Sequence, residues 1–410
     1  MDSKELSPVF RNEFSKIVAV ISKTFGLEHL QLAEDIVSET FLFALETWDS
    51  KGMPDDPPAW LYTVAKNKMN KFFQRDKIYK RTVMPHLKER GAAIIEEENF
   101  FSIENIKDSQ LQMMFAICNP VIVAEAQIGL ALRILAGFGI EEIAEAFLTN
   151  KETVNKRLYR AKEKLRAEKV GMELPGKNEI RNRLDSVLHV IYLLFNEGYY
   201  ASTSNHTLRK DLCLEALRLG LLLTEEPTTD LPKTNALVSL MCYHASRFSA
   251  RQGPENEPVL YERQDRSLWD QVLIERGNYY LIQSAKGNEI SSYHLEARIA
   301  YFHSGQTATE EKWIGILSLY DQLVQINSSA TVMLNRIYAL SKVKGPEAAL
   351  REINAAQFPN NHFYFTLLGE LNSRLDPMSA KNNFIRAMEL AKTKAEREQI
   401  AAKLERLQNN

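Results

Sequence analysis

Cysteine is scarce in this sequence. Only Cys118, Cys213 and Cys242 occur, far apart, without a CxxC pair. The one spacing with any likeness to a metal site is the weak Cys242-Tyr-His244. Disulfide frameworks and zinc ribbons need more cysteines at closer spacing. We therefore expect three buried thiols in a reducing compartment, with no disulfide and no bound metal.

Long apolar runs and catalytic constellations are also missing. No stretch of 18 apolar residues occurs, and the polar start with Asp2 and Glu5 is unlike a secretory signal. We therefore expect a cytoplasmic protein without a membrane partner. No Ser/His/Asp set, metal-ligand spacing or glycine-rich phosphate loop is present. We expect no catalytic residues and no cofactor, although a large helical domain with scattered His and Glu leaves an enzyme open as a third class.

Strand signals are nearly absent, whereas helical periodicity runs through most of the 410 residues. The sequence therefore predicts an all-α protein of two or three domains. The net charge of -2 conceals local segregation. Residues 60–90 hold nine Lys or Arg against two acids, whereas residues 91–108 hold five acids against Lys107. Such segregation indicates binding surfaces of opposite sign better than the total charge does.

Residues 137–166 are the stretch around which the chain is organised. A short helix is expected at 141–148, with Ile143, Ala144, Phe147 and Leu148 on its apolar face. Residues 149–152 have the spacing of a capping box, in which Thr149 and Glu152 would satisfy amides at the start of a second helix. Two short helices with a tight turn between them are typical of a helix-turn-helix.

The second of these helices is strongly basic. Val154, Leu158, Ala161 and Leu165 recur at helical spacing, and residues 151–169 hold eight Lys or Arg against three Glu. In a helix-turn-helix, the second helix enters the major groove and its cations contact phosphates. The alternative is a solvated amphipathic helix at the edge of a bundle.

Two helices are expected at the N-terminus, at residues 8–25 and 30–48, the first ending at Gly26. The second would bury an apolar face that includes Leu45. Its other side carries an acidic stripe of Glu34, Asp35, Glu39 and Glu46. This stripe indicates either a surface for a basic partner or an ordinary solvated face.

A Pro- and Asp-rich loop, residues 49–58, precedes a third helix at 59–80. That helix carries a stripe of amide and hydroxyl side chains, Thr63, Asn67, Asn70 and Gln74. Lys66, Lys71, Arg75 and Lys77 flank the stripe. Amide groups can bond base edges and cations can neutralise phosphates, so the helix is a candidate for nucleic-acid contact. A polar surface with scattered lysines is the alternative.

Residues 81–107 have weak periodicity and predict a linker. Helices at 109–118 and 124–136 are expected to pack on the helix-turn-helix and complete a four-helix domain. Beyond residue 182 the chain predicts a second large helical domain. Degenerate tetratricopeptide-like repeats are expected at about 293–390, capped by a charged helix at 395–407.

The order of these motifs resembles a protein family. AEDIVSETFLFALE, a Pro-containing loop, AWLYTVAKNKMNKFFQR, a linker and EEIAEAFLTNKETVNKRLYRAKEKLR follow one another. This order is similar to that of bacterial extracytoplasmic-function sigma factors, which have regions two and four. VIYLLFNEGYYAS and SLWDQVLIERG, further along, are similar to the subgroup with a tetratricopeptide-like C-terminal extension.

The resemblance implies a role for each surface. Asp35 and Glu39 would bind the clamp of the polymerase β′ subunit, and region four would touch the β flap. Loop 49–58 would capture a flipped base of the minus-10 element. The implied minus-10 contacts are Asn67, Asn70, Lys71 and Gln74. The implied minus-35 contacts are Lys151, Thr153, Asn155, Lys156, Arg157 and Arg160.

We therefore expect a region-two-like domain at 1–81, a linker at 82–107 and a region-four-like domain at 108–170. A helical middle domain at 171–292 and tetratricopeptide-like repeats at 293–410 would follow. The expected function is a promoter-specificity subunit that recruits core RNA polymerase to promoter DNA, with C-terminal repeats that could hold a protein or peptide. The alternative is a helix-turn-helix regulator with a tetratricopeptide sensor, which binds duplex DNA without polymerase.

Overall fold

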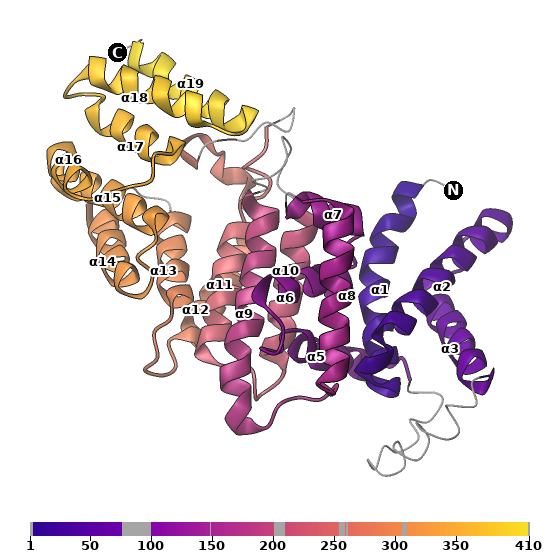
Figure 1. Ribbon diagram of the computed structural model, residues 1–410. Coiled ribbons are helices and arrows are strands. Elements are labelled where there is room, and N and C mark those ends of the chain that lie inside the picture. Colours follow the sequence, from indigo (N-terminus) through magenta and orange to yellow (C-terminus); the bar gives the residue numbers. More distant parts are fainter. Residues whose placement is uncertain are drawn as a thin grey trace. The chain divides into compact units, whose positions relative to one another are not determined.

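The computed structural model describes residues 3–75, 100–147, 149–200, 210–253, 259, 261–305 and 310–408. These residues form helices and connecting turns with no strand, which confirms the predicted all-α class. They fall into two compact units, Met1–Leu194 and Phe195–Asn410, and the boundary lies within one helix (Figure 1). None of the helices in the described ranges is long and apolar enough to cross a membrane.

The first unit contains nine described helical segments before the boundary helix. They are α1 (Ser3–Phe25), η1 (Leu27–His29), α2 (Leu30–Lys51), α3 (Pro57–Arg75), α5 (Ile103–Ile117), α6 (Ala124–Leu130), the π-helical η4 (Ala131–Leu135), α7 (Ile140–Ala146) and α8 (Lys151–Ala167). Helix α9 (Lys177–Tyr200) carries the chain across the boundary.

Helix α1 lies at the centre of the first unit. Its Phe14, Ile17 and Val18 are fully buried, and it packs against α2, α3, α5 and η4. It ends where the sequence predicts, because Gly26 adopts a φ of 98° that other residues rarely reach. Burial of this apolar stripe from several sides ties the N-terminal helices to the segments that follow residue 100.

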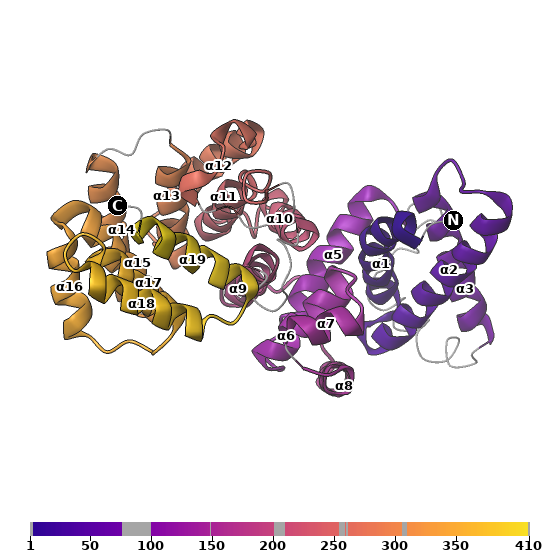
Figure 2. The same cartoon turned by 90° about the horizontal axis from the view of Figure 1, so that it is seen from above.

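Helix α5 differs from the prediction in its start and in its neighbour. It begins at Ile103, six residues before the expected start, because the Ser102 hydroxyl caps it by accepting a hydrogen bond from the Asn105 amide at 3.2 Å. It packs mainly on α1, as Figure 2 shows, and on η4, whereas the sequence predicted packing on the two helices now seen as α7 and α8. Gln110 Nε2 donates to the buried Ser15 hydroxyl at 3.1 Å across this contact.

The second unit begins with α10 (Lys210–Glu225), α11 (Pro232–Ala245), η5 (Tyr261–Arg263), η6 (Arg266–Leu268), α12 (Gln271–Ser284) and α13 (Ser292–Ser304). It continues with α14 (Glu310–Ile326), α15 (Ala330–Lys344), α16 (Pro346–Ala355), α17 (His362–Asn372), α18 (Pro377–Leu390) and α19 (Lys394–Gln408). Helix α11 packs against α10, α12 and α13. From α14 to α19, consecutive helices pack on one another in the order of the chain, except where α15 also meets α17 (Figures 1 and 2).

All three cysteines are free and buried, as the sequence predicts. Burial raises the pKa of the Cys118, Cys213 and Cys242 thiols to about 12. Because the thiolate is the reactive form, these side chains act as small apolar groups in the core.

Close packing at the α17–α18 contact predicts an effect of Gly369→Ala. A Cβ at Gly369 would lie 2.6 Å from Cε1 of Phe384, a ring that is almost fully buried. Overpacking a core costs about 1–3 kcal/mol, whereas alanine regains up to about 1 kcal/mol of helix propensity. We expect the variant to lose about 1–2 kcal/mol of unfolding free energy in urea denaturation. The control is Gly305→Ala, where the nearest atom lies at 3.6 Å. Equal stability of the two variants would contradict the prediction.

Candidate functional site

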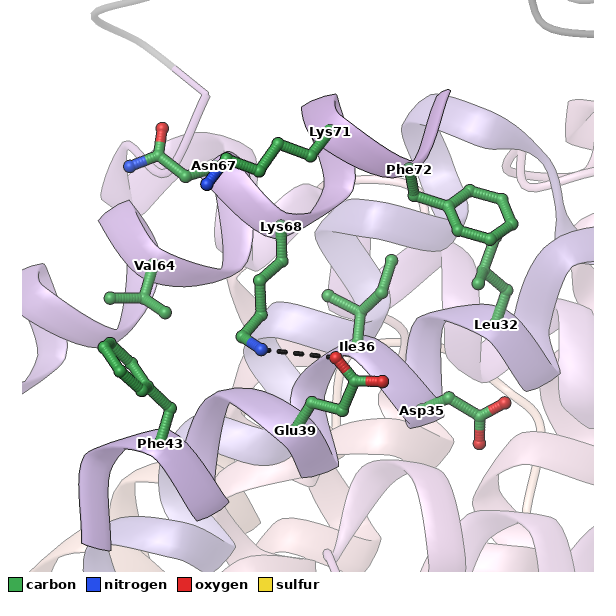
Figure 3. A pocket seen from close by; sticks show the side chains of 10 residues that line it. All are labelled: Leu32, Asp35, Ile36, Glu39, Phe43, Val64, Asn67, Lys68, Lys71 and Phe72. Carbon is green, nitrogen blue, oxygen red and sulfur yellow. Dashed lines mark hydrogen bonds and ion pairs between the residues drawn. The ribbon is translucent and has the colours of Figure 1, made fainter. Parts of the chain in front are cut away.

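A groove runs between α2 and α3 in the first unit. It has a volume of about 1020 Å³. One wall comes from α2 and the other from α3, so the groove depends on the turn between these helices. Its lining residues are Leu32, Asp35, Ile36, Glu39, Phe43, Val64, Asn67, Lys68, Lys71 and Phe72 (Figure 3).

The turn that sets the two walls side by side follows the predicted pattern. Helix α2 ends before Gly52, whose φ is 82°, and α3 begins at Pro57. Asp56 caps α3, because its carboxylate accepts a hydrogen bond from the Ala59 amide at 3.0 Å. Trp60 then packs between Trp48 and Phe43, with ring centroids 5.4 Å and 5.7 Å away. These contacts fix the angle at which α3 returns along α2.

The groove has an acidic wall and a basic wall. Asp35 and Glu39 are exposed on α2, and Lys71 is exposed on α3. Lys68 Nζ reaches across to Glu39 Oε2 at 3.2 Å, as the dashed line in Figure 3 shows. This pair is open to solvent and contributes little to stability. Lys68 is thus paired with Glu39, whereas the carboxylate of Asp35 points away from Lys68 (Figure 3).

The structure therefore brings two predicted sets of site residues to one groove. Asp35 and Glu39, the predicted polymerase contacts, face Asn67 and Lys71, two of the predicted minus-10 contacts. Asn70 is half-buried beside them on α3, and the side chain of Gln74 lies outside the described residues.

The predicted acidic stripe on α2 is wrong at one position. Glu34 is only 3% exposed and forms ion pairs with Arg133 of η4 and Lys162 of α8. Its Oε1 accepts from Arg133 Nε at 2.9 Å, and its Oε2 accepts from Lys162 Nζ. A buried carboxylate is tolerated only with such partners. Glu34 therefore joins the N-terminal helices to η4 and α8.

One apolar side chain on α2 that was predicted to be buried is exposed. Leu45 was expected to be buried but is 45% exposed, next to the exposed Leu42 and Phe43. These residues lie off the buried row of Phe41, Ala44 and Trp48. Leu45 lies four residues after Phe41, so periodicity alone placed it on the buried face and gave no signal of its exposure. Exposed apolar patches of this kind indicate contact with another molecule.

Helix α8 presents its basic side chains to solvent. Val154, Leu158, Ala161 and Leu165 are buried as predicted, and α8 packs on α6 and α7. Lys151, Thr153, Asn155, Lys156 and Arg160 are exposed, whereas Arg157 is half-buried over the Phe147 ring at 5.5 Å. Lys162, about half a turn from Arg160, is the cation that binds Glu34. Five of the six predicted minus-35 contacts thus share an open surface.

The capping box predicted at the start of α8 is wrong. The cap is Asn150, whose side chain accepts a hydrogen bond from the Thr153 amide at 2.8 Å. Thr149 lies before the helix, and its amide donates to the Ala144 carbonyl at 2.9 Å. Glu152 forms an ion pair with Lys156 at 2.6 Å, one turn along the exposed face. Asparagine is at least as favourable as threonine at an N-cap, and in this turn Asn150 rather than Thr149 occupies that position.

Comparisons with known proteins identify two segments. Residues 14–78 match the family model of Sigma-70 region 2, which includes both walls of the groove up to Phe72. Residues 183–285 match a family of unknown function, DUF6596. "Uncharacterized protein R00370" of Rhizobium meliloti (strain 1021) is 32% identical over 387 residues, which cover 92% of this chain and 90% of that protein. No solved structure matches.

Proposed function

We propose that this chain, which belongs to the same protein family as R00370 of Rhizobium meliloti and carries a Sigma-70 region 2, is a promoter-specificity subunit of RNA polymerase. A Sigma-70 region 2 implies interaction with core RNA polymerase and promoter DNA. The proposal extends this role to the whole first unit. The protein acts by binding and carries out no reaction of its own.

One observation carries the proposal. Within the region 2 match, a single groove has an acidic wall with Asp35 and Glu39 and a basic wall with Asn67 and Lys71. An acidic wall suits a basic polymerase surface, for which we propose the β′ clamp. Amides and lysines at the opposite rim suit the bases and phosphates of a melting minus-10 element. A polymerase-bound factor needs both surfaces close together, because melting occurs on the polymerase.

Helix α8 supplies the proposed minus-35 surface. Lys151, Thr153, Asn155, Lys156 and Arg160 are exposed on one basic helix that follows a short helix and a tight turn. This geometry suits the major groove, where the N-terminal residues of such a helix meet base edges. Arg157 would contact phosphate from the side, since its guanidinium rests on Phe147. The same region would touch the β flap.

We assign the chain to the extracytoplasmic-function group, in the subgroup with a tetratricopeptide-like extension. Helices α13 to α18 would form three degenerate repeats, with α19 as the cap. Two of their apolar cores are centred on Ile337 and on Phe384. Stacked helix pairs of this kind offer a surface to a peptide or another domain, and this half would regulate the factor or dock it.

Run-off transcription from randomised promoter fragments tests the function. Core RNA polymerase is supplied with and without the full chain, and transcripts that appear only with the chain are sequenced. We expect a shared minus-35 and minus-10 sequence among them. If no transcript depends on the chain while it binds duplex DNA without polymerase, the helix-turn-helix regulator is correct instead.

The minus-35 surface predicts the effect of Arg160→Ala. Arg160 is exposed and forms no ion pair with the described residues, so its loss removes a proposed phosphate contact and no structural bond. We expect the slope of log affinity against log salt for a promoter duplex to fall by about 0.9. The matched control is Arg166→Ala on the same helix, where Arg166 pairs with Glu163 at 3.5 Å. An unchanged slope in Arg160→Ala would contradict the assignment of α8.

A further inference from the structure

Three arginines gather around aromatic rings in the second unit, in the turns that follow α11 and in η6. Arg251 lies over the ring of Tyr199 at 3.6 Å from the centroid. Arg247 lies 5.8 Å and Arg266 5.1 Å from the centroid of Trp269. Arg247 also donates to the Tyr199 hydroxyl at 2.6 Å, next to Arg251. The rings of Tyr199 and Trp269 thus lie against three guanidinium groups. We call Arg247, Arg251 and Arg266 the arginine cluster.

The arginine cluster has no carboxylate partner among the described residues. Arg247 contacts the Tyr199 hydroxyl and His244 Nδ1, and Arg266 donates to the Gly305 carbonyl at 2.6 Å. Nη1 of Arg251 is buried and has no hydrogen-bond partner in the described part of the chain. Buried N–H groups of a guanidinium are nearly always satisfied, so an orphan of this kind requires an explanation.

Three carboxylates that are close by in the sequence and lie in the described ranges are engaged elsewhere. Asp265 accepts from the Ser267 amide at 2.9 Å, and Asp270 accepts from the Leu273 amide at 3.0 Å. Glu262 lies 3.8 Å from Arg406 of α19. Each of these acids caps a helix or pairs with another cation, and none reaches a guanidinium of the arginine cluster within 4 Å.

The pKa values of neighbouring basic groups reflect a positive potential at this place. His303 has a pKa lowered to about 4 by burial and then by Lys312, Arg247 and Arg266. Burial, followed by Arg247, Arg251 and His303, lowers the pKa of His244 well below its ordinary value. Burial and Arg266 lower the pKa of Lys312 as well. Both histidines are therefore neutral at pH 7, and no described carboxylate pairs with the three guanidinium groups.

We propose that the arginine cluster is a binding site for the oxyanion of a small ligand, a phosphoryl or carboxylate group. Guanidinium forks match both groups bidentately, and an anion would offset the repulsion among three like charges. All three arginines are half-buried and Trp269 is buried, which suits a small ligand better than a duplex backbone that tracks exposed cations. In the sequence, Arg247 precedes η5 and Arg266 begins η6, so one anion would tie the turn after α11 to η6.

This site belongs to the second unit, whereas the groove and α8 belong to the first, and its test is independent of polymerase. The residues Arg247 and Arg251 and the ring of Trp269 belong to the segment that matches DUF6596. A ligand there would supply a chemical signal to the second unit. Failure of this inference would leave the proposed transcription function intact, because anion binding is measured on the full chain alone.

Isothermal titration of the full chain with inorganic phosphate and, separately, with malonate tests the inference, at ionic strength held constant with sodium chloride. We expect saturable binding of at least one anion, weakened tenfold or more in Arg251→Gln and in Arg266→Gln. The matched control is Arg263→Gln, an exposed arginine in η5, for which we expect a change of less than twofold. Binding of phosphate alone identifies a phosphoryl ligand, and binding of malonate alone identifies a carboxylate.

Two outcomes would overturn the inference: neither anion binds saturably, or Arg251→Gln binds the anion as tightly as the Arg263→Gln control does. Circular dichroism checks the fold of each variant. If Arg251→Gln does not fold, Arg251→Lys takes its place, since it keeps the charge and removes the bidentate fork. Undiminished binding in a folded Arg251→Lys would then count against the site.

Discussion

Replacement of Glu34 by glutamine is expected to lower the unfolding free energy of the first unit by about 3 kcal/mol. The Glu34 carboxylate is buried between Arg133 and Lys162, and it is the acid that both cations share. Glutamine keeps the size but carries no charge, and its NH₂ group would face donors. Removal of one partner from a buried ion pair costs about 3–5 kcal/mol. We take the lower end because Arg133 and Lys162 are 18% and 15% exposed.

Urea denaturation followed by circular dichroism measures this loss. The control is Asp35→Asn, the same chemical change on the next residue, whose side chain is exposed. We expect Asp35→Asn to stay within about 0.5 kcal/mol of the parent protein, as surface substitutions usually do. A double variant, Glu34→Gln with Lys162→Met, should lose less unfolding free energy than the two single variants lose in total, because each single change already removes the same ion pair. Strict additivity would show that Glu34 and Lys162 are not coupled.

Charge reversal at Asp35 is expected to weaken binding to core RNA polymerase tenfold or more. Asp35 is exposed at the acidic wall of the groove, away from the Lys68–Glu39 pair. If the partner surface is basic, as we propose, arginine there places like charges opposite each other, which costs several kcal/mol at an interface. The expected measurement is the dissociation constant from fluorescence anisotropy of labelled chain titrated with core polymerase, at two salt concentrations.

The matched control is Glu46→Arg, an equal charge reversal on an exposed residue of α2 that does not line the groove. We expect it to retain binding within about threefold, the scale of rim charges. Equal loss in both variants would assign the contact to the exposed acidic face in general. Unaltered binding in Asp35→Arg, with an intact circular dichroism spectrum, would refute the docking role of the groove.

Much of this molecule follows from local sequence pattern. The all-α class, the end of α1 at Gly26 and the start of α3 at its prolines follow from helical periodicity and from the φ preferences of Gly and Pro. The buried row of α8 follows from the same periodicity, so the exposed basic side chains of that helix were predictable too. These features depend on interactions within one or two helical turns, which is why the sequence alone was sufficient.

Tertiary contacts decided what the periodicity left ambiguous. An acidic residue on α2 is equally polar whether it faces solvent or a buried cation, so only the approach of Arg133 and Lys162, about 100 and 130 residues away in sequence, separated Glu34 from Asp35. Leu45 became exposed because α3 and α1 cover other faces of α2. The groove likewise depends on the packing of two consecutive helices, and the arginine cluster joins α9 to the turn after α11 and to η6. Sequence determined the helices and their apolar faces, whereas packing determined which polar residues meet, because a charge acquires its role from its neighbours in space.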